Sequence, residues 1–379
     1  MKEFWLEKAE CTGCAACQNA CPVDALVMEP DMCGFAYPRI NDACIDCNKC
    51  EQVCKRRLEL PPVNDEPPTY ASWSKNADVR FESTSGGAFT ELAAPVIERG
   101  GAVIGAAYNK HNVIMHTLVR DMAGLAKIRQ SKYAQSVIGG VFRLVKKELE
   151  QGNEVLFCGC PCQVAGLKAY LNKEWDSLLC VDFICRGVNS PKAFASWLDE
   201  VGMRQNEHID RVWFKFKKNG WKLSPRCTQI RFANGEARVY DQQENLFMVG
   251  YLEANLYMRP SCSQCEFKGS SRRSDITLGD FWGLSKELDD DKGASLVLVN
   301  TPKGEETFLR ARDSLVVNER TFDEILGGNV CFESSVKINP KSEQFFADLD
   351  SMPFSEALHK SFKRSILSRV KHKIKSLIR

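Results

Sequence analysis

The stretch CTGCAACQNACP, residues 11–22, places four cysteines within eleven positions and ends in a proline. Cysteines at this spacing rarely serve packing alone, and the whole chain holds 18 of them in 379 residues. The N-terminus, MKEFWLEKAEC, lacks the basic start and apolar run of a secretory signal. We therefore expect a reducing, cytoplasmic setting, where so many cysteines indicate metal or redox chemistry rather than disulfides.

A second cysteine series repeats this spacing. The first reads C-x2-C-x2-C-x3-C-P, and the second, at residues 44–54, reads C-x2-C-x2-C-x3-C. A C-x2-C-x2-C loop supplies three thiolates of a 4Fe–4S cluster, and in two-cluster ferredoxins the fourth comes from the other series. The spacing predicts one cluster on Cys11, Cys14, Cys17 and Cys54, and a second on Cys21, Cys44, Cys47 and Cys50.

A zinc site and a disulfide knot are the alternatives for these cysteines. Zinc motifs usually bring two C-x2-C pairs rather than two triplets, and disulfides do not suit the compartment. Both series closely resemble the bacterial-type ferredoxin module, an α+β domain that would occupy residues 1–60. Cys33, between the two series, has no place in either set and is expected to be a bystander.

Composition and charge exclude other classes of protein. The hydrophobic fraction of 44% and the charged fraction of 26% are ordinary for a globular protein, and no apolar run is long enough to span a membrane. The net charge is +2, but residues 360–379 carry eight Lys or Arg and no acid. Without those eight positive charges the preceding 359 residues have a net charge of −6, which argues against nucleic-acid binding.

A proline-rich segment, PPVNDEPP at residues 61–68, divides the chain and predicts an extended, fairly stiff linker. Beyond it, apolar runs predict strands at 101–108, 113–119, 154–158 and 178–184. Periodic patterns predict helices at 137–150, from about 163, and after the N-cap Ser190. This rhythm predicts an α/β core with a mainly parallel sheet and covering helices. We divide it into residues 69–150, 151–320 and a helical region at 321–379.

An electron carrier joined to a larger domain needs a destination for its electrons, and a flavin is the usual converter between one- and two-electron chemistry. The chain has no G-x-G-x-x-G, so the Rossmann signature is missing. Instead STSGGAFTEL, residues 83–92, opens a helix whose backbone N–H groups suit a phosphate. A capped helix start without a ligand is the alternative. The polar segment RQSKYAQS, residues 129–136, is by itself ordinary surface.

Three later segments carry further cysteines. FCGCPCQVAGL (157–167) follows a buried strand, where α/β sheets bind ligands, and CVDFICRG (180–187) ends another. RPSCSQCEFKGSSRRSDITLGDFWG (259–283) adds a C-x2-C pair. In this order, after the Ser–Gly turn and the Lys–Tyr pair, these motifs resemble the beta-subunit family of coenzyme F420-reducing hydrogenases and dehydrogenases. That family includes 7-hydroxymethyl chlorophyll a reductase, and the resemblance covers residues 69 to about 315.

The resemblance implies an FAD-containing iron–sulfur oxidoreductase with a flavoprotein core. It implies cofactor-binding roles for Ser85, Gly86, Gly87, Lys132, Tyr133, Gln135, Arg272, Asp275 and Asp280. It also implies a third 4Fe–4S cluster on Cys162, Cys185, Cys262 and Cys265. Buried free thiols are the alternative for these cysteines, and a surface ion pair is the alternative for the arginine. Cys158 and Cys160 are left open as substitute ligands or a thiol pair.

The expected function is electron transfer between a one-electron donor or acceptor protein, the clusters and FAD, which exchanges hydride with a small molecule such as F420. The alternatives are an electron-transfer subunit of a larger redox complex with no substrate of its own, and a cluster-stabilised binding protein. Residues 361–379 form a basic amphipathic pattern that suits an anionic membrane surface, a partner, or its own domain. The sequence specifies no catalytic residue, electron-flow direction or oligomeric state.

Overall fold

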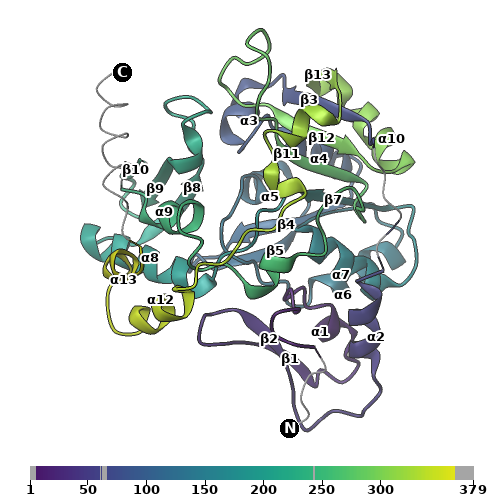
Figure 1. Ribbon diagram of the computed structural model, residues 1–379. Helices are drawn as coiled ribbons and strands as arrows, with labels where there is room; N and C mark the ends of the chain where they lie inside the picture. Colours follow the sequence, from purple (N-terminus) through teal and green to yellow (C-terminus); the bar gives the residue numbers. More distant parts are fainter. Residues whose placement is uncertain (1–5, 60, 62–65, 242–243, 363–379) are drawn as a thin grey trace.

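The structure is a computed structural model that describes residues 6–59, 61, 66–241 and 244–362 (Figure 1). Part of the expected linker and the basic pattern beyond residue 362 lie outside the described residues. No helix in the described ranges is long and apolar enough to cross a membrane.

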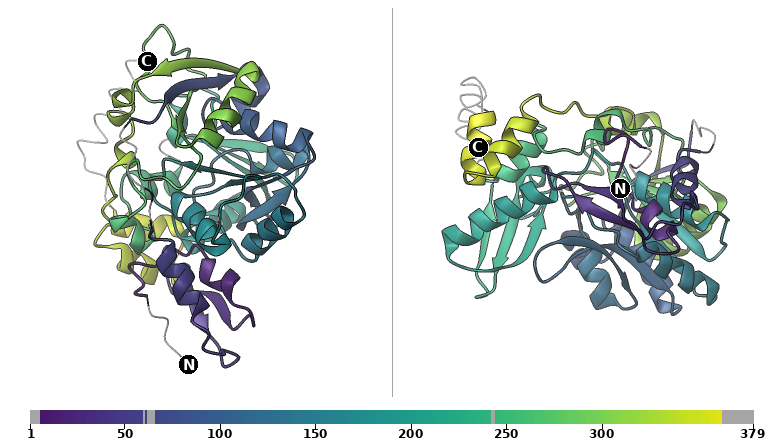
Figure 2. Two further views of the ribbon diagram at one scale, coloured as in Figure 1. Left: turned by 90° about the vertical axis from the view of Figure 1, so that its right-hand side faces the viewer. Right: turned by 90° about the horizontal axis from the view of Figure 1, so that it is seen from below.

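The cysteine-rich module is small and lies at one end of the molecule (Figure 2). Its strands pair antiparallel, and its helices each begin directly after a residue in the left-handed conformation, Ala15 with φ 57° and Asn48 with φ 55°. These left-handed residues turn each cysteine loop into its helix. The elements are α1 Ala16–Ala20, β1 Leu26–Pro30, β2 Ala36–Ile40 and α2 Lys49–Arg56.

The core is built on an eight-stranded sheet with the order β13-β3-β12-β11-β7-β6-β4-β5. The strands are β3 Thr69–Ser74, β4 Ala102–Tyr108, β5 Ile114–Val119, β6 Val155–Cys158, β7 Leu178–Phe183, β11 Ile276–Asp280, β12 Ser295–Val299 and β13 Leu315–Arg320. Neighbours among the central strands β4, β6, β7 and β11 are parallel, and all outer pairings are antiparallel.

The expected α/β fold is therefore confirmed, and the expectation of a parallel sheet holds for its centre. The outer strands reverse because β5 follows β4, and β12 follows β11, as neighbours in the sheet with antiparallel register. The strands β6 (VLFC) and β12 (SLVLV) are almost wholly buried, as strands covered on both faces require.

Helices cover both faces of this sheet. One apolar cluster joins Leu92, Leu125 and Phe308, from three helices, to one face, and another joins Phe142 and Leu167 to the opposite face. The helices on the first face are α4 Ala88–Glu98, α5 Met122–Ile128 and α10 Pro302–Ala311. Those on the second are α6 Val141–Glu150 and α7 Pro161–Leu171. The cysteine-rich module packs against this second face, because its residues share the apolar cluster of α6 and α7.

A second, smaller sheet that we did not expect lies between β7 and β11 in the chain. Its antiparallel strands are β8 Ile209–Phe214, β9 Thr228–Phe232 and β10 Ala237–Tyr240. It packs on α8 Pro191–Gln205, α9 Leu246–Leu252, α12 Ser342–Leu349 and α13 Phe354–Ser361. Stacked aromatic rings such as Trp197 and Phe247, with centroids 5.3 Å apart, form its core. Shorter elements are α3 Ala77–Glu82, α11 Asp323–Leu326 and single turns at 224–226, 260–264, 312–314 and 330–332.

Candidate functional site

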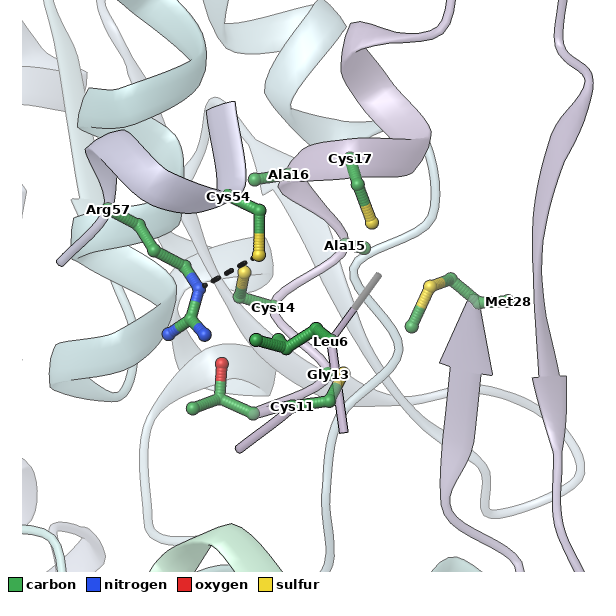
Figure 3. Close-up of a pocket in the computed structure, with 11 residues that line it drawn as sticks. Leu6, Cys11, Gly13, Cys14, Ala15, Ala16, Cys17, Met28, Cys54 and Arg57 are labelled. Carbon is green, nitrogen blue, oxygen red and sulfur yellow. Dashed lines mark hydrogen bonds between the residues drawn. The ribbon is translucent and has the colours of Figure 1, made fainter. Parts of the chain in front are cut away.

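The first predicted cysteine set lines one small pocket between α1, α2 and the loop before α1 (Figure 3). All four thiols are buried, at 6 to 8% exposure: Cys11, Cys14, Cys17 and Cys54. Burial raises the pKa of the Cys17 thiol well above its usual value, and the other three thiols raise it further. Four converging thiols are a donor set that fits a 4Fe–4S cluster, whose iron stabilises the thiolate form.

Two buried arginines contact cysteines of this pocket. Arg57 is 1% exposed, and its Nε donates to Cys54 Sγ over 3.5 Å. Arg259 is 0% exposed, and its Nη2 and Nε donate to Cys11 Sγ at 3.6 Å and Cys11 O at 2.7 Å. Sequence reasoning singled out neither residue. The available signal was position, since Arg57 follows Cys54 by three residues and Arg259 precedes Cys262 by three.

The second predicted set lies closer to solvent. Cys47 is exposed, and Cys21, Cys44 and Cys50 are half-buried. Burial raises the pKa of Cys50, and the neighbouring Cys47 and Cys44 thiols raise it further. Cys21 packs against the same apolar cluster as Cys44 and Cys50, and its Sγ accepts a hydrogen bond from Ala25 N at 3.2 Å.

Five more cysteines line a single pocket beyond the carboxyl ends of β6 and β7: Cys160, Cys162, Cys185, Cys262 and Cys265. The structure thus brings the four expected third-cluster residues together, with Cys160 as a fifth thiol. We call this the five-thiol pocket. A hydrogen bond from the Cys160 thiol, together with nearby Lys268, lowers the pKa of Cys185 against the opposing effect of burial.

The polar groups of the five-thiol pocket also suit a cluster. The Thr12 and Ser261 hydroxyls line it, are buried, and have no hydrogen-bond partner among the described residues. Such groups are costly unless something in the pocket accepts their protons, and cluster sulfides are acceptors. Lys268 adds a positive charge while donating to Cys185 O at 2.6 Å and Cys331 O at 2.7 Å.

The remaining cysteines do not join these sets. Cys158 ends β6 but is not among the residues that line the five-thiol pocket, and burial raises its pKa to about 12. Cys33 lines neither pocket. Within the described ranges, no three histidine, cysteine, aspartate or glutamate side chains form a site for a single metal ion. The ligands of a 4Fe–4S cluster stand apart because each binds a different iron.

The expected flavin turn lies over the ends of β3 and β12. Gly87 has φ 96° and forms the N-cap of α4, as the sequence predicts. The Ser85 hydroxyl donates to Ala294 O at 2.5 Å, and Gly86 N donates to Ser295 Oγ at 2.9 Å. These two groups are therefore engaged inside the protein, and they shape the turn rather than offer free donors to a ligand.

Two lysines that form no ion pair with a carboxylate in the described ranges lie near this turn, and one of them contacts it directly. Lys217 is buried and donates to the carbonyls of Arg80 at 2.7 Å, Ser85 at 2.5 Å and Lys292 at 3.0 Å. Lys132 donates likewise to the carbonyls of residues 127, 129 and 130. Burial lowers the pKa of both to about 7. An anion placed beside these ammonium groups would stabilise their charged form.

The segment with Lys132 lies against the turn, because Ser131 N donates to Thr84 Oγ1 at 2.8 Å. Asp280, at the carboxyl end of β11, forms an ion pair with Lys215. The Tyr133 hydroxyl also bonds to Lys215, and burial raises the pKa of that phenol. A flat aromatic pair adjoins them: Trp221 and Trp282 stack with centroids 4.1 Å apart at 9°, and Trp221 Nε1 donates to Thr84 O.

The structure separates the other three expected cofactor residues from the turn. Asp275 lies at the opposite, amino end of β11, where its carboxylate accepts from Cys180 N at 2.7 Å and Thr301 Oγ1 at 2.8 Å. Arg272 lines the five-thiol pocket and pairs with Asp182 at 3.4 Å. Gln135 also lines that pocket, and its side chain bonds to Arg259 and to Thr12 O.

Comparison with known proteins adds two family matches. Residues 152–325 match the family described as the C terminus of the beta subunit of coenzyme F420 hydrogenase/dehydrogenase. Residues 10–58 match the 4Fe-4S dicluster domain.

Individual relatives share shorter stretches. The chain is 40% identical over 70 residues to acetyl-CoA decarbonylase/synthase complex subunit alpha 1 of Methanosarcina acetivorans, covering 17% of this chain. It is 38% identical over 64 residues to the Methanosarcina mazei protein of that name, covering 16%. The chain spans only 8% of the length of these relatives. A chain of the F420-reducing [NiFe] hydrogenase complex from Methanosarcina barkeri superposes with a TM-score of 0.45 and 15% identity, covering 79% of this chain and 91% of that one.

Proposed function

Residues 152–325 belong to the coenzyme F420 hydrogenase/dehydrogenase beta-subunit family and residues 10–58 are a 4Fe-4S dicluster domain, and from this premise we propose that the chain is an FAD-dependent iron–sulfur oxidoreductase. It passes electrons between a one-electron partner protein and a small molecule that exchanges hydride, for which the family name suggests F420. The observation that carries the proposal is the five-thiol pocket, which adjoins the dicluster domain through Thr12.

In this proposal a third 4Fe–4S cluster takes Cys162, Cys185, Cys262 and Cys265 as ligands. The cluster, when bound, supplies one-electron transfer. Its net charge with four thiolates is negative, and Lys268 and Arg272 beside the pocket balance that charge. The Thr12 and Ser261 hydroxyls donate toward it, which gives both their missing partners.

FAD is proposed to lie along the carboxyl ends of the central strands. When bound it converts between one- and two-electron steps. Lys132 and Lys217 attract its phosphates through their positive charge rather than by direct hydrogen bonds, because the donors of both ammonium groups bond to backbone carbonyls. The Lys215–Asp280 pair and the Trp221–Trp282 stack lie next to that anion site and shape the surface for the flavin ring.

Cofactor content tests the proposal. Anaerobically purified protein should hold about 12 irons and one FAD per chain, since three 4Fe–4S clusters need that iron. The double variant Cys162→Ser, Cys262→Ser should fall to about 8 irons. Cys227→Ser is the control, because this buried thiol packs in a separate apolar cluster. Wild-type protein with about 8 irons would refute the third cluster, and protein without flavin would refute the enzyme.

The alternative, an electron-transfer subunit with no substrate of its own, is supported by the exposed second cysteine set. Cys47 is exposed and Ile45 beside it is 61% exposed, which suits contact with a partner protein. Mixing the isolated, oxidised protein with reduced F420 separates the two functions. An enzyme bleaches its flavin band without any partner, whereas a relay leaves the band unchanged.

A further inference from the structure

The first cysteine pocket and the five-thiol pocket share a wall. Thr12 lines both. The Cys14 side chain rests on Gly166 of α7 so closely that a Cβ there would lie 3.0 Å from Cys14 Sγ. Cys162 stands in the first turn of that same helix. Of the two ferredoxin cluster sites, the first is therefore the one that adjoins the five-thiol pocket.

The second set differs in its surroundings. Its thiols are exposed or half-buried. A cation beside it, Arg143, donates to Cys21 O at 2.8 Å rather than to sulfur. The Arg143 side chain is 39% exposed and pairs with Asp24. Solvent and this carboxylate screen its charge from the second cluster.

We propose that Arg57 and Arg259 raise the reduction potential of the first ferredoxin cluster and thereby make it the bridge between the second cluster and the five-thiol pocket. This inference rests on the proposed function, because it requires the ferredoxin clusters. One electron leaves the second cluster, which is oxidised, and enters the first, which is reduced, with no proton transferred.

Reduction adds one negative charge to a cluster, and burial alone opposes that charge. The two guanidinium groups reverse this effect, since each donates an N–H to a different ligand, Cys54 or Cys11. Hydrogen bonds to cluster sulfur and nearby positive charge both favour the reduced state, and the effect is strong where water is excluded. Arg57 is also close enough to Cys162 for their charges to interact, which places it between the two sites.

The two arginines come from different parts of the chain. Arg57 follows α2 within the module, and Arg259 belongs to the core, three residues before Cys262. The Arg259 contact with Cys11 exists only while the module is docked on the core. Docking therefore contributes to the reduction potential of the first cluster. An undocked module keeps the Arg57 contact with Cys54 but loses the Arg259 contact with Cys11.

A redox titration of the full-length holoprotein, followed by electron paramagnetic resonance, tests the proposal. Arg57→Gln and Arg259→Gln should each shift one cluster's midpoint potential to a more negative value and leave the others in place. Arg56→Gln is the matched control, because this neighbour donates to Ala169 O rather than to a thiol. Arg259→Lys, which keeps the charge, should recover part of the shift and serves if the glutamine variant folds poorly.

The proposal would be overturned if the Arg57→Gln, Arg259→Gln and Arg259→Lys variants held full iron and showed unchanged midpoint potentials. It would also be overturned if Arg56→Gln shifted a midpoint potential by the same amount. Iron counts of the wild type keep this test separate from the proposed enzyme function. A wild type with about 8 irons loses the third cluster, yet the titration of the two ferredoxin clusters still decides the role of the arginines.

Discussion

The cysteine-rich module and the five-thiol pocket both gather cysteines, but by different means. The module takes its eight predicted ligand cysteines from residues 11–54, on two short loops and the short helices that follow them. The pocket takes its five from residues 160–265, on the segments that follow β6 and β7 and on a turn between α9 and β11. The first arrangement is a local motif, and we expect its order to depend on bound iron. The second is set by a fold whose apolar clusters exist without any cofactor.

Removal of iron should expose this difference most strongly. The module has too few residues to hold a core without its clusters, whereas the sheet has its own apolar clusters on both faces. After anaerobic chelation we expect full amide hydrogen exchange in α1 and α2 and retained protection in β4, β6 and β7. Hydrogen-exchange mass spectrometry measures both regions in one sample. Loss of protection in the two regions together would remove the distinction.

Gly86→Ala should have the next largest effect, on the core side of the comparison. An added Cβ would lie 2.3 Å from Ser72 O and 2.6 Å from Ser295 N, both backbone atoms that cannot yield easily. We expect a loss of about 3 kcal/mol in the free energy of unfolding of the core, with loss of bound flavin. Chemical denaturation and flavin content measure these changes.

Gly140→Ala is the control for that substitution. Gly140 has φ −88° and no heavy atom within 4 Å of an added Cβ. Its stability should change by less than about 0.5 kcal/mol. If Gly86→Ala and Gly140→Ala had the same free energy of unfolding, close packing of the turn on β3 and β12 would not contribute to the stability of the core.

The pH dependence of flavin binding probes the two carbonyl-bound lysines. Their pKa values of about 7 lie below the usual value, so the flavin-free protein loses both protons above that pH. Binding a phosphate then requires proton uptake. Affinity for FAD should be constant below pH 7 and fall above it, by up to about tenfold per pH unit for each lysine.

Fluorescence titrations between pH 6 and 9 measure this profile. Lys217→Arg retains its charge throughout and should flatten the decline, while Lys217→Met should weaken binding most at pH 6. An affinity that rises with pH in the wild type would contradict the anion site.

The smallest effect is expected for Cys160→Ser, which tests whether Cys160 is a ligand of the proposed third cluster. If Cys160 is only the hydrogen-bond partner of Cys185, its loss should leave the iron content near 12 and raise the pKa of Cys185 in iron-free protein. Cys262→Ser, by comparison, should cost about four irons. Loss of four irons from the Cys160 variant would make Cys160 a ligand in place of one of the others.

The spacing of residues 11–54 predicts which thiols meet because ligand motifs on short loops need no tertiary information. The α/β fold was predictable for the related reason that buried strands and amphipathic helices leave local patterns. The smaller sheet was not, because α12 and α13 join β8–β10 from more than a hundred residues away. The antiparallel outer strands of the main sheet were not predictable for the same reason, since β3 near the start of the core pairs with β13 near its end.

The site was harder to predict than the fold. The family resemblance implied cofactor-binding roles for Arg272 and Gln135, and in the structure both line the five-thiol pocket. Arg57 and Arg259 were missed because their role depends on how the module docks, which no local pattern records. Lys217 was missed because it reaches the turn from the loop after β8, in the part of the chain whose sheet was unexpected.

The glycine at position 166 leaves no gap between the module and α7. An added methyl group there would push the loop that carries Cys14 away from α7. The distance between the first cluster site and the five-thiol pocket would then increase. This substitution would therefore slow electron transfer between the two sites without altering any cluster ligand. Because the fit is tight, a different ferredoxin domain fused to the core would need a cysteine loop that matches the surface of α7 before it could transfer electrons to the core.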